Sequence, residues 1–178
     1  SDWMPDTSVI CKEDDFKLFK EKYSDVILKP LNGMGGDSIY KFNKSSEDHL
    51  KIFKELTNNY KTMVMVQNFL PEIYDGDYRI LIINGEPFPI GLARIPQKGS
   101  FKGNLAAGGR GEARELSADQ IQASKEIGKI LIQEGILFAG IDMIGSSLTE
   151  INITSPTGAR EILVQTGQNP IKALLQSI

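Results

Sequence analysis

Three oxygen-bearing side chains stand close together in the stretch GIDMIGSSLTEINIT (140–154), where apolar residues surround a small turn. They are Asp142, Glu150 and Asn152. If residues 145–147 form a three-residue hairpin turn, the two flanking strands pair so that Asp142 lies opposite Glu150. Side chains alternate along a strand, so Glu150 and Asn152 share one face, and opposed Cβ atoms lie about 5 Å apart. The spacing therefore predicts that the three side chains converge.

Two unpaired carboxylates at this distance repel each other, and burying them without a partner is unfavourable. A divalent cation removes this conflict. Two carboxylates and an amide oxygen are hard ligands, suited to Mg2+ that bridges to phosphate oxygens. The alternative is that Asp142 and Glu150 lie on a solvated hairpin face and have no function.

A second candidate group lies in ILKPLNGMGGDSI (27–39), where Lys29 ends a β-rich segment and a glycine-dense turn follows. Gly33, Gly35 and Gly36 would let backbone N–H groups approach a phosphate closely, because no Cβ intervenes. This is not the Walker pattern, since no Lys-Ser or Lys-Thr follows the glycines. Such a turn alone is typical of a plain hairpin; a lysine before it and a metal triad after it favour a nucleotide site.

The segment 96–114 contains five glycines and shows almost no periodicity. Loops longer than about 12–15 residues without structure of their own are usually functional lids or disorder. Its basic side chains could clamp anions when the loop closes. They are Lys102, Arg110 and Arg114. Two more arginines, Arg79 and Arg94, belong to the preceding hairpin, and a surface salt bridge is the alternative role for each.

Strand-like and helix-like segments alternate around these residues. Strands are expected at 7–12, 25–30, 38–42, 62–70 and in a hairpin, 77–94, that turns at Asn84-Gly85. Helices are expected at 13–23, at 45–56 with Ser45 or Ser46 as cap, at 117–135 with Ser117 as cap and Gly135 near the end, and from 169 onward. This order predicts an α+β fold with antiparallel hairpins rather than a doubly wound parallel sheet.

The composition excludes several classes of protein. A length of 178 residues suits one domain or two small lobes, and the net charge of -3 argues against a nucleic-acid or anionic-membrane binder. No apolar run approaches the roughly 20 residues of a membrane span, and the start shows no signal peptide. A single cysteine, Cys11, suits a reducing cytoplasm, and a single histidine, His49, leaves no parts for a Ser-His-Asp triad or a histidine-rich zinc site.

With these residues identified, the chain resembles the ATP-grasp region of the bacterial type of glutathione synthetase, nearly from end to end. ATP-grasp enzymes share the late Asp…Glu-x-Asn set and the strand lysine, whereas NLAAGGRGE and NITSPT are more specific. The resemblance implies an ATP-grasp fold, in which two α+β lobes with antiparallel sheets clasp ATP. It implies a small lobe at 1–68 and a large lobe at 69–178, with the lid loop at 96–114. The stretches that carry it are DVILKPLNGMGGDSI, VQNFLPEIYDGDYRILIINGEP, LARIPQKGSFKGNLAAGGRGEAR and GIDMIGSSLTEINITSPTGAREI.

The resemblance also implies residue roles. ATP would be bound by Lys29, Gly33, Gly35, Gly36, Gln67, Asn68, Phe69, Leu70 and Asp77, with main-chain groups of 67–70 at adenine and Asp77 near the ribose. Two magnesium ions, with manganese as the alternative, would be held by Asp142, Glu150 and Asn152. The catalytic basic groups would be Arg79, Arg94, Lys102 and Arg110. The substrates would be contacted by Arg94, Asn104, Thr154, Ser155, Pro156 and Thr157, and the TSPTGA loop (154–159) would help to seat the acceptor.

The implied activity is that of a cytoplasmic ligase whose partners are the small molecules ATP, γ-glutamylcysteine and glycine. Glutathione, ADP and phosphate would be the products, formed through an acyl phosphate from which a lid excludes water. For the full-length enzyme a homo-oligomer is implied, with neither nucleic acid nor membrane as a partner.

The chain departs from the family pattern at three places. The family's amino-terminal domain, with part of the peptide site and an earlier ATP-binding lysine, has no counterpart here, so the chain is expected to be a fragment. Lys102 stands where an arginine is expected, which removes a bidentate phosphate contact. Gly158 stands where a larger residue is expected. The alternatives are another ATP-grasp ligase, such as one acting on a protein tail or on D-alanine, and a nucleotide-binding module without catalysis.

Overall fold

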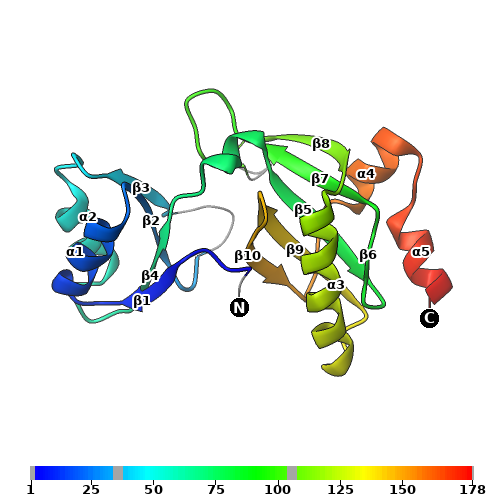
Figure 1. Ribbon diagram of the computed structural model, residues 1–178, viewed down its shortest axis with the longest axis horizontal. Coiled ribbons are helices and arrows are strands. Elements are labelled where there is room, and N and C mark those ends of the chain that lie inside the picture. Colours follow the sequence, from blue (N-terminus) through cyan, green and yellow to red (C-terminus); the bar gives the residue numbers. More distant parts are fainter. Residues whose placement is uncertain (1–2, 34–37, 104–107, 178) are drawn as a thin grey trace. The chain divides into compact units, whose positions relative to one another are not determined.

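The computed structural model describes residues 3–33, 38–103 and 108–177, so the predicted site residues Gly35, Gly36 and Asn104 lie outside the described residues. The chain forms two compact units (Figure 1). One is Pro5–Leu70, and the other combines Ser1–Met4 with Pro71–Ile178. All strand pairings described are antiparallel, as the sequence predicts.

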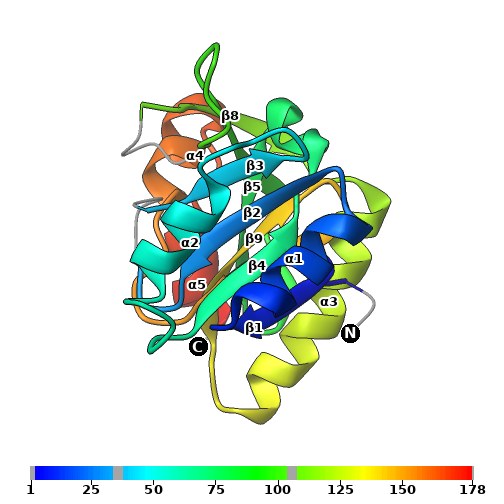
Figure 2. The same cartoon turned by 90° about the vertical axis from the view of Figure 1, so that its left-hand side faces the viewer.

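The smaller unit is a four-stranded sheet with two helices on one face, which Figure 2 shows in front of the sheet. Its apolar core joins Phe16 and Phe53 of the helices to Val26 and Leu28 of the central strands, all fully buried. The predicted elements are thus confirmed, apart from a few residues at their ends. In the spatial order β1-β4-β2-β3, the strands are β1 (Thr7–Ile10), β4 (Val64–Asn68), β2 (Asp25–Pro30) and β3 (Tyr40–Asn43), and the helices are α1 (Glu13–Lys22) and α2 (His49–Leu56).

The predicted serine cap of the second helix is wrong. Helix α2 begins at His49, and no side chain caps it. Ser45 and Ser46 instead donate their hydroxyls to Oδ1 of Asn43, at 2.9 and 3.0 Å, so they stabilise the turn before the helix. Short polar side chains readily bond nearby backbone and turn groups, which is why the same residues suit a turn or a cap.

The larger unit contains a six-stranded sheet. Its hairpin at Asn84-Gly85 is confirmed, with positive φ angles of 48° and 81° at the two turn residues. In the spatial order β10-β9-β5-β7-β8, the strands are β10 (Ser147–Asn152), β9 (Phe138–Ile144), β5 (Asp77–Ile83), β7 (Ile90–Ile95) and β8 (Arg110–Glu115). The short strand β6 (Glu86–Pro87) also pairs with β5, and the 3-10 helix η1 (Pro71–Asp75) precedes β5 in the chain.

Helices cover both faces of this sheet, α3 (Ala118–Gln133) on one side and α4 (Ala159–Thr166) and α5 (Pro170–Ser177) on the other (Figure 1). The predicted cap of α3 is confirmed, because Ser117 and Gln120 bond reciprocally in a capping box. Helix α4 is not anticipated by the sequence analysis. On its side of the sheet, the apolar core is built around Leu81 and Ile83 of β5, which leaves the start of β5 for polar residues.

Two expectations about loops are wrong. The turn after β9 has two residues, Gly145 and Ser146, rather than three, and the register shifts between Leu148 and Glu150. The predicted lid loop 96–114 is shorter than expected, because Arg110–Glu115 is a strand paired with Ile90–Ile95. Among the described residues, no helix is both long enough and apolar enough to cross a membrane.

Candidate functional site

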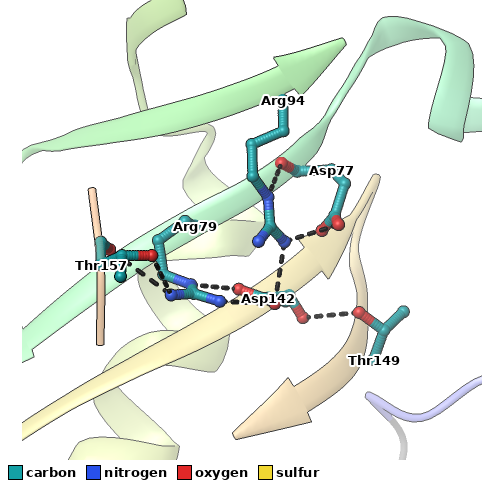
Figure 3. A network of polar contacts seen from close by, with 6 residues as sticks. All are labelled: Asp77, Arg79, Arg94, Asp142, Thr149 and Thr157. Carbon is teal, nitrogen blue, oxygen red and sulfur yellow. Dashed lines mark hydrogen bonds and ion pairs between the residues drawn. The ribbon is translucent and has the colours of Figure 1, made fainter. Parts of the chain in front are cut away.

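Four charged side chains form a buried network on the sheet face that also carries α4 and α5 (Figure 3). Asp77 and Arg79 come from β5, Arg94 from β7 and Asp142 from β9. Strand register brings them together, since Asp77 pairs with Arg94 and Arg79 pairs with Asp142. Arg79, Arg94 and Asp142 are only 7%, 7% and 3% exposed, so the surface salt bridge considered for the arginines is wrong.

Asp142 is shared by both arginines. Arg79 binds it through two parallel contacts, Nε to Oδ1 at 2.5 Å and Nη2 to Oδ2 at 3.0 Å. Nη2 of Arg94 lies 2.8 Å from Oδ2 of Asp142 and 2.5 Å from Oδ2 of Asp77. Two guanidinium groups thus face two carboxylates, and this balance of charge is what makes burial of the network tolerable.

The surroundings of Asp77 and Arg94 shift the pKa values of both groups. Burial raises its pKa to about 6, although the attraction of Arg94 lowers it, and the nearby carboxylate of Asp142 raises it further. Burial lowers the pKa of Arg94, but the attraction of Asp77 and Asp142 outweighs this, so its pKa lies above the usual value. Oδ1 of Asp77 is buried and has no hydrogen-bond partner among the described residues.

The predicted convergence of Asp142, Glu150 and Asn152 is confirmed. Glu150 pairs directly with Asp142 across β9 and β10. In the amide orientation that satisfies both of its neighbours, Asn152 donates to Oε1 of Glu150 at 2.9 Å and accepts from Nη2 of Arg79 at 3.2 Å. Arg79 therefore contacts both Asp142 and Asn152, and Asn152 contacts Glu150. Their role as metal ligands stays a prediction.

The oxygen atoms of this group suit Mg2+. A carboxylate offers about four lone-pair sites, and the three arginine contacts leave one site on Oδ1 of Asp142. Glu150 is exposed and Asn152 is half-buried. Within the described ranges, no set of three or more His, Cys, Asp or Glu side chains is arranged for a metal, so amide and phosphate or water oxygens would have to complete the coordination.

The loop before α4 also reaches the network. Nη1 of Arg79 donates to the carbonyl oxygen and the hydroxyl of Thr157, at 3.4 and 3.3 Å. Gly158 follows with a φ of +110°, and a Cβ there would lie 3.3 Å from Cγ of Arg79. Glycine at this position is thus explained by the backbone, which a larger residue adopts only with strain. Thr154 and Ser155 are exposed, and Pro156 packs where a Cβ at Gly140 would lie.

The remaining basic residues of the predicted site are placed differently. Arg110 pairs with Ile95, so its side chain faces the opposite side of the sheet from Arg94. It forms an ion pair of 2.5 Å with Glu112 and is 74% exposed, so the expected grouping of Arg110 with the catalytic arginines is not found. Arg114 likewise binds Glu112. Lys102 is half-buried beside Gly103, where a Cβ would lie 2.5 Å from the carbonyl oxygen of Arg94.

In the smaller unit, strand alternation puts Lys29 on the face of β2 opposite the buried Val26 and Leu28. Gly33 lies in the turn after this strand. The main chain of 67–70 was predicted to contact adenine. Two of its N–H groups are already bonded, because Asn68 donates to the carbonyl oxygen of Asp6 and Phe69 donates to that of Asp25.

The side chains around these expected adenine contacts are engaged as well. Gln67 is buried and donates to the hydroxyl of Thr7 at 2.8 Å. The ammonium of Lys41 lies 3.5 Å from the centre of the Phe69 ring. The amides of Asn68 and Phe69 are likewise already engaged within the smaller unit.

The sequence analysis missed the pairing of Asp77 with Arg94 and the hydrogen bond of Thr149. The hydroxyl of Thr149 donates to the carbonyl oxygen of Asp142 at 3.1 Å (Figure 3). The pairing could have been found only from the register of β5 and β7, which changes after β6. No sequence pattern marks Thr149.

The chain matches characterised protein families. The family model for the ATP-grasp domain of prokaryotic glutathione synthetase matches residues 1–167. A glutathione synthetase of Escherichia coli is 49% identical over 162 residues, which cover 91% of this chain and 51% of that protein. A glutathione synthetase of Vibrio cholerae is 48% identical over 164 residues, covering 90% and 52%. The chain thus spans about half the length of the curated relatives it matches.

Solved structures agree in fold. D-cycloserine synthetase DcsG has a TM-score of 0.68 at 15% identity and covers 96% of this chain and 62% of its own. The ATP-grasp ligase PsnB, complexed with minimal precursor, Mg and ADP, has a TM-score of 0.66 at 16% identity, covering 98% and 53%. The D-alanine–D-alanine ligase of Bacillus anthracis has a TM-score of 0.64 at 14% identity, covering 98% and 61%. At these identities the likeness shows the ATP-grasp fold alone.

Proposed function

Because the chain belongs to the family of prokaryotic glutathione synthetase ATP-grasp domains, we propose that it is the nucleotide- and metal-binding part of a ligase that joins glycine to γ-glutamylcysteine. The observation that carries this proposal is the carboxylate of Asp142, shared by Arg79 and Arg94 and paired across the strands with Glu150. Fixed positive groups beside an oxygen-rich metal site suit a reaction that moves a phosphoryl group.

The reaction has two steps that balance without a protein nucleophile. The C-terminal carboxylate of γ-glutamylcysteine attacks the γ-phosphorus of ATP, the bond to the β-phosphate oxygen breaks, and ADP leaves. The amine of glycine then attacks the acyl carbon, loses a proton and displaces phosphate. Phosphorylation is needed because a free carboxylate is a poor electrophile.

The two arginines offset negative charge in this scheme. Both are held rigidly, Arg79 by Asp142 and Thr157, and Arg94 by Asp77 and Asp142. Rigid cations need no reorganisation when charge develops on the phosphoryl or the peptide carboxylate. Arg94 keeps its positive charge, because both of its carboxylate partners hold its pKa above the usual value.

Asp142, Glu150 and Asn152 would hold the magnesium. When bound, the ion would neutralise phosphate oxygens and align them for displacement. The lone-pair site left on Oδ1 of Asp142 by the arginine contacts and the exposed position of Glu150 support this assignment. Lys29 and the turn around Gly33 would bind phosphate, and Asp77, engaged with Arg94, would act by holding that arginine rather than by reaching the ribose.

Isothermal titration of the chain with a non-hydrolysable ATP analogue tests the proposal. We expect binding that requires Mg2+ and weakens at least about tenfold in Glu150→Gln, which loses a ligand charge at an exposed position. Binding of equal strength after removal of Mg2+ would overturn the metal assignment. In a separate assay with ATP itself, ADP release that requires both γ-glutamylcysteine and glycine, and no other amino acid, is the expected specificity.

A second candidate is a nucleotide-binding module without catalysis. It is favoured by one observation, that Arg110, expected among the catalytic basic groups, is exposed and paired with Glu112 instead. Magnesium-dependent binding of the analogue without ADP release, under all combinations of acceptors, would support this alternative against the ligase.

A further inference from the structure

An extra residue in β10 decides which side chains stand beside Asp142. After the two-residue turn, Ser147 pairs with Ile144 and Leu148 pairs with Met143. The next pair is Glu150 with Asp142, so Thr149 has no partner of its own and forms a β-bulge. A bulge of this kind places two residues of one strand opposite one residue of the other.

The bulge moves the side chains of the following β10 residues to the opposite face of the sheet from the one they would occupy in a regular strand. Leu148 packs in the core beneath α3, together with Met143. In a regular strand, residues two apart share a face, so Glu150 would follow Leu148 into this core and would pair with Ile141. Burial of its carboxylate there would be strongly unfavourable. With the bulge, Glu150 and Asn152 instead stand on the face of Asp142 and Arg79.

The side chain of Thr149 is bonded at the point where the ladder is interrupted. Its hydroxyl donates to the carbonyl oxygen of Asp142 at 3.1 Å, and the contact is partly buried (Figure 3). It thereby ties the extra residue to the residue whose carboxylate is shared by the two arginines. A bulge leaves local backbone groups without ladder partners, so a side-chain donor here stabilises one conformation of the strand.

We propose that Thr149 is a positioning residue for the metal site: its hydroxyl bond to Asp142 holds the bulge that turns Glu150 and Asn152 toward Asp142. This inference rests on the proposed function, because it concerns the same candidate site for a divalent cation and nucleotide. Thr149 itself does not touch the reacting groups; it acts through the orientation of Glu150 and Asn152.

The test compares Thr149→Val, which keeps the shape and removes the donor, with Thr149→Ser, which keeps the donor. Mn2+ binding is measured by electron paramagnetic resonance in the presence of a non-hydrolysable ATP analogue. One hydrogen bond is worth roughly 0.5–1.5 kcal/mol, so Thr149→Val is expected to weaken Mn2+ binding about 3- to 10-fold. Thr149→Ser is expected to stay within about twofold of the unmodified chain. Equal affinity in Thr149→Val would overturn the inference.

Glu150→Gln separates failure of this inference from failure of the metal site. If Glu150→Gln weakens Mn2+ binding and Thr149→Val does not, Thr149 has no positioning role and the metal site stands. If neither change matters, the metal site itself is wrong. In the double variant, Thr149→Val is expected to add less to Glu150→Gln than it costs alone, because part of its effect passes through Glu150. Full additivity would also contradict a role through Glu150. If Thr149→Val does not fold, Thr149→Ala gives the same comparison.

Discussion

Arg79 and Asp142 face each other directly across β5 and β9. Each oxygen of the carboxylate accepts a hydrogen bond from a different nitrogen of the same guanidinium, at 2.5 and 3.0 Å. This planar match is available to arginine and not to lysine. Because Arg94 shares the same carboxylate, Asp142 is the residue on which the buried network depends. Stability and function are therefore expected to respond together at this position.

Asp142→Asn is expected to destabilise the chain strongly. It removes one charge and leaves two buried arginines opposite Asp77 alone, and breaking such a pair typically costs about 3–5 kcal/mol. Urea denaturation measures the change. Glu150→Gln is the matched control, since this exposed carboxylate contributes to the same candidate site but not to the buried ion pairs, and its free energy of unfolding should change by less than about 0.5 kcal/mol. Equal losses of unfolding free energy in Asp142→Asn and Glu150→Gln would contradict the expectation that only Asp142 supports the buried ion pairs.

Arg79→Lys is expected to lower stability by about 1–3 kcal/mol, although it keeps the charge. Lysine cannot bind both oxygens of Asp142 and also reach Thr157, so partners in a buried region are left without donors. Thermal unfolding gives the loss. Hydrogen exchange should show faster exchange of α4 amides, since Thr157 lies just before that helix. Unchanged α4 protection would mean that the contact with Thr157 does not hold the loop.

Asp77 is expected to give the stability of the chain a distinct pH dependence. Its pKa is raised from 3.8 to about 6 on folding, so the folded state holds the proton more tightly than the unfolded state. This contribution is full below pH 4, is lost as the pH rises toward 6, and is constant above that. Two pKa units correspond to roughly 3 kcal/mol.

The variant Asp77→Asn removes this titration while keeping the shape. The difference in unfolding free energy between the unmodified chain and Asp77→Asn should therefore fall by about 2–3 kcal/mol between pH 4 and pH 7. Denaturant titrations at several pH values measure it, and other carboxylates cancel in the comparison. If this difference in unfolding free energy instead rises with pH, the attraction of Arg94 outweighs the effect of burial on Asp77, and folding stabilises the ionised carboxylate.

Features set by local chemistry could be predicted from the sequence. The turn at Asn84-Gly85 needs two positive φ angles, which this pair adopts easily, and the cap at Ser117 needs only a glutamine three residues later. Asp142 opposite Glu150 was also predicted, but for an incomplete reason. The turn is one residue shorter than assumed, and the bulge at Thr149 restores the pairing.

Features that depend on distant partners could not be predicted. Strand β8 has no apolar alternation; it forms because it pairs with β7 and because Gln165 of α4 bonds its free edge. The side chain of Gln165 accepts from the amide of Ala113 at 2.8 Å and donates to the carbonyl of Gly111 at 3.1 Å. Asp77 meets Arg94 because the register of β5 changes between β6 and β7, beyond Phe88 and Pro89. Neither contact follows from residue spacing.

Gly158→Ala is expected to disturb the candidate metal and nucleotide site indirectly, through contact with Arg79. At φ +110° a side chain is strained, and its Cβ would meet Cγ of Arg79 at 3.3 Å and Cδ2 of Leu92 at 3.5 Å. Strain alone costs about 1–2 kcal/mol. Gly167→Ala is the matched control, because Gly167 ends the same helix at φ +73° but has open space around its Cβ. Gly158→Ala should lose more stability than Gly167→Ala and should also weaken binding of the Mg2+–nucleotide analogue, whereas Gly167→Ala should leave binding unchanged. Equal effects of the two variants on binding would show that contact with Arg79 does not matter.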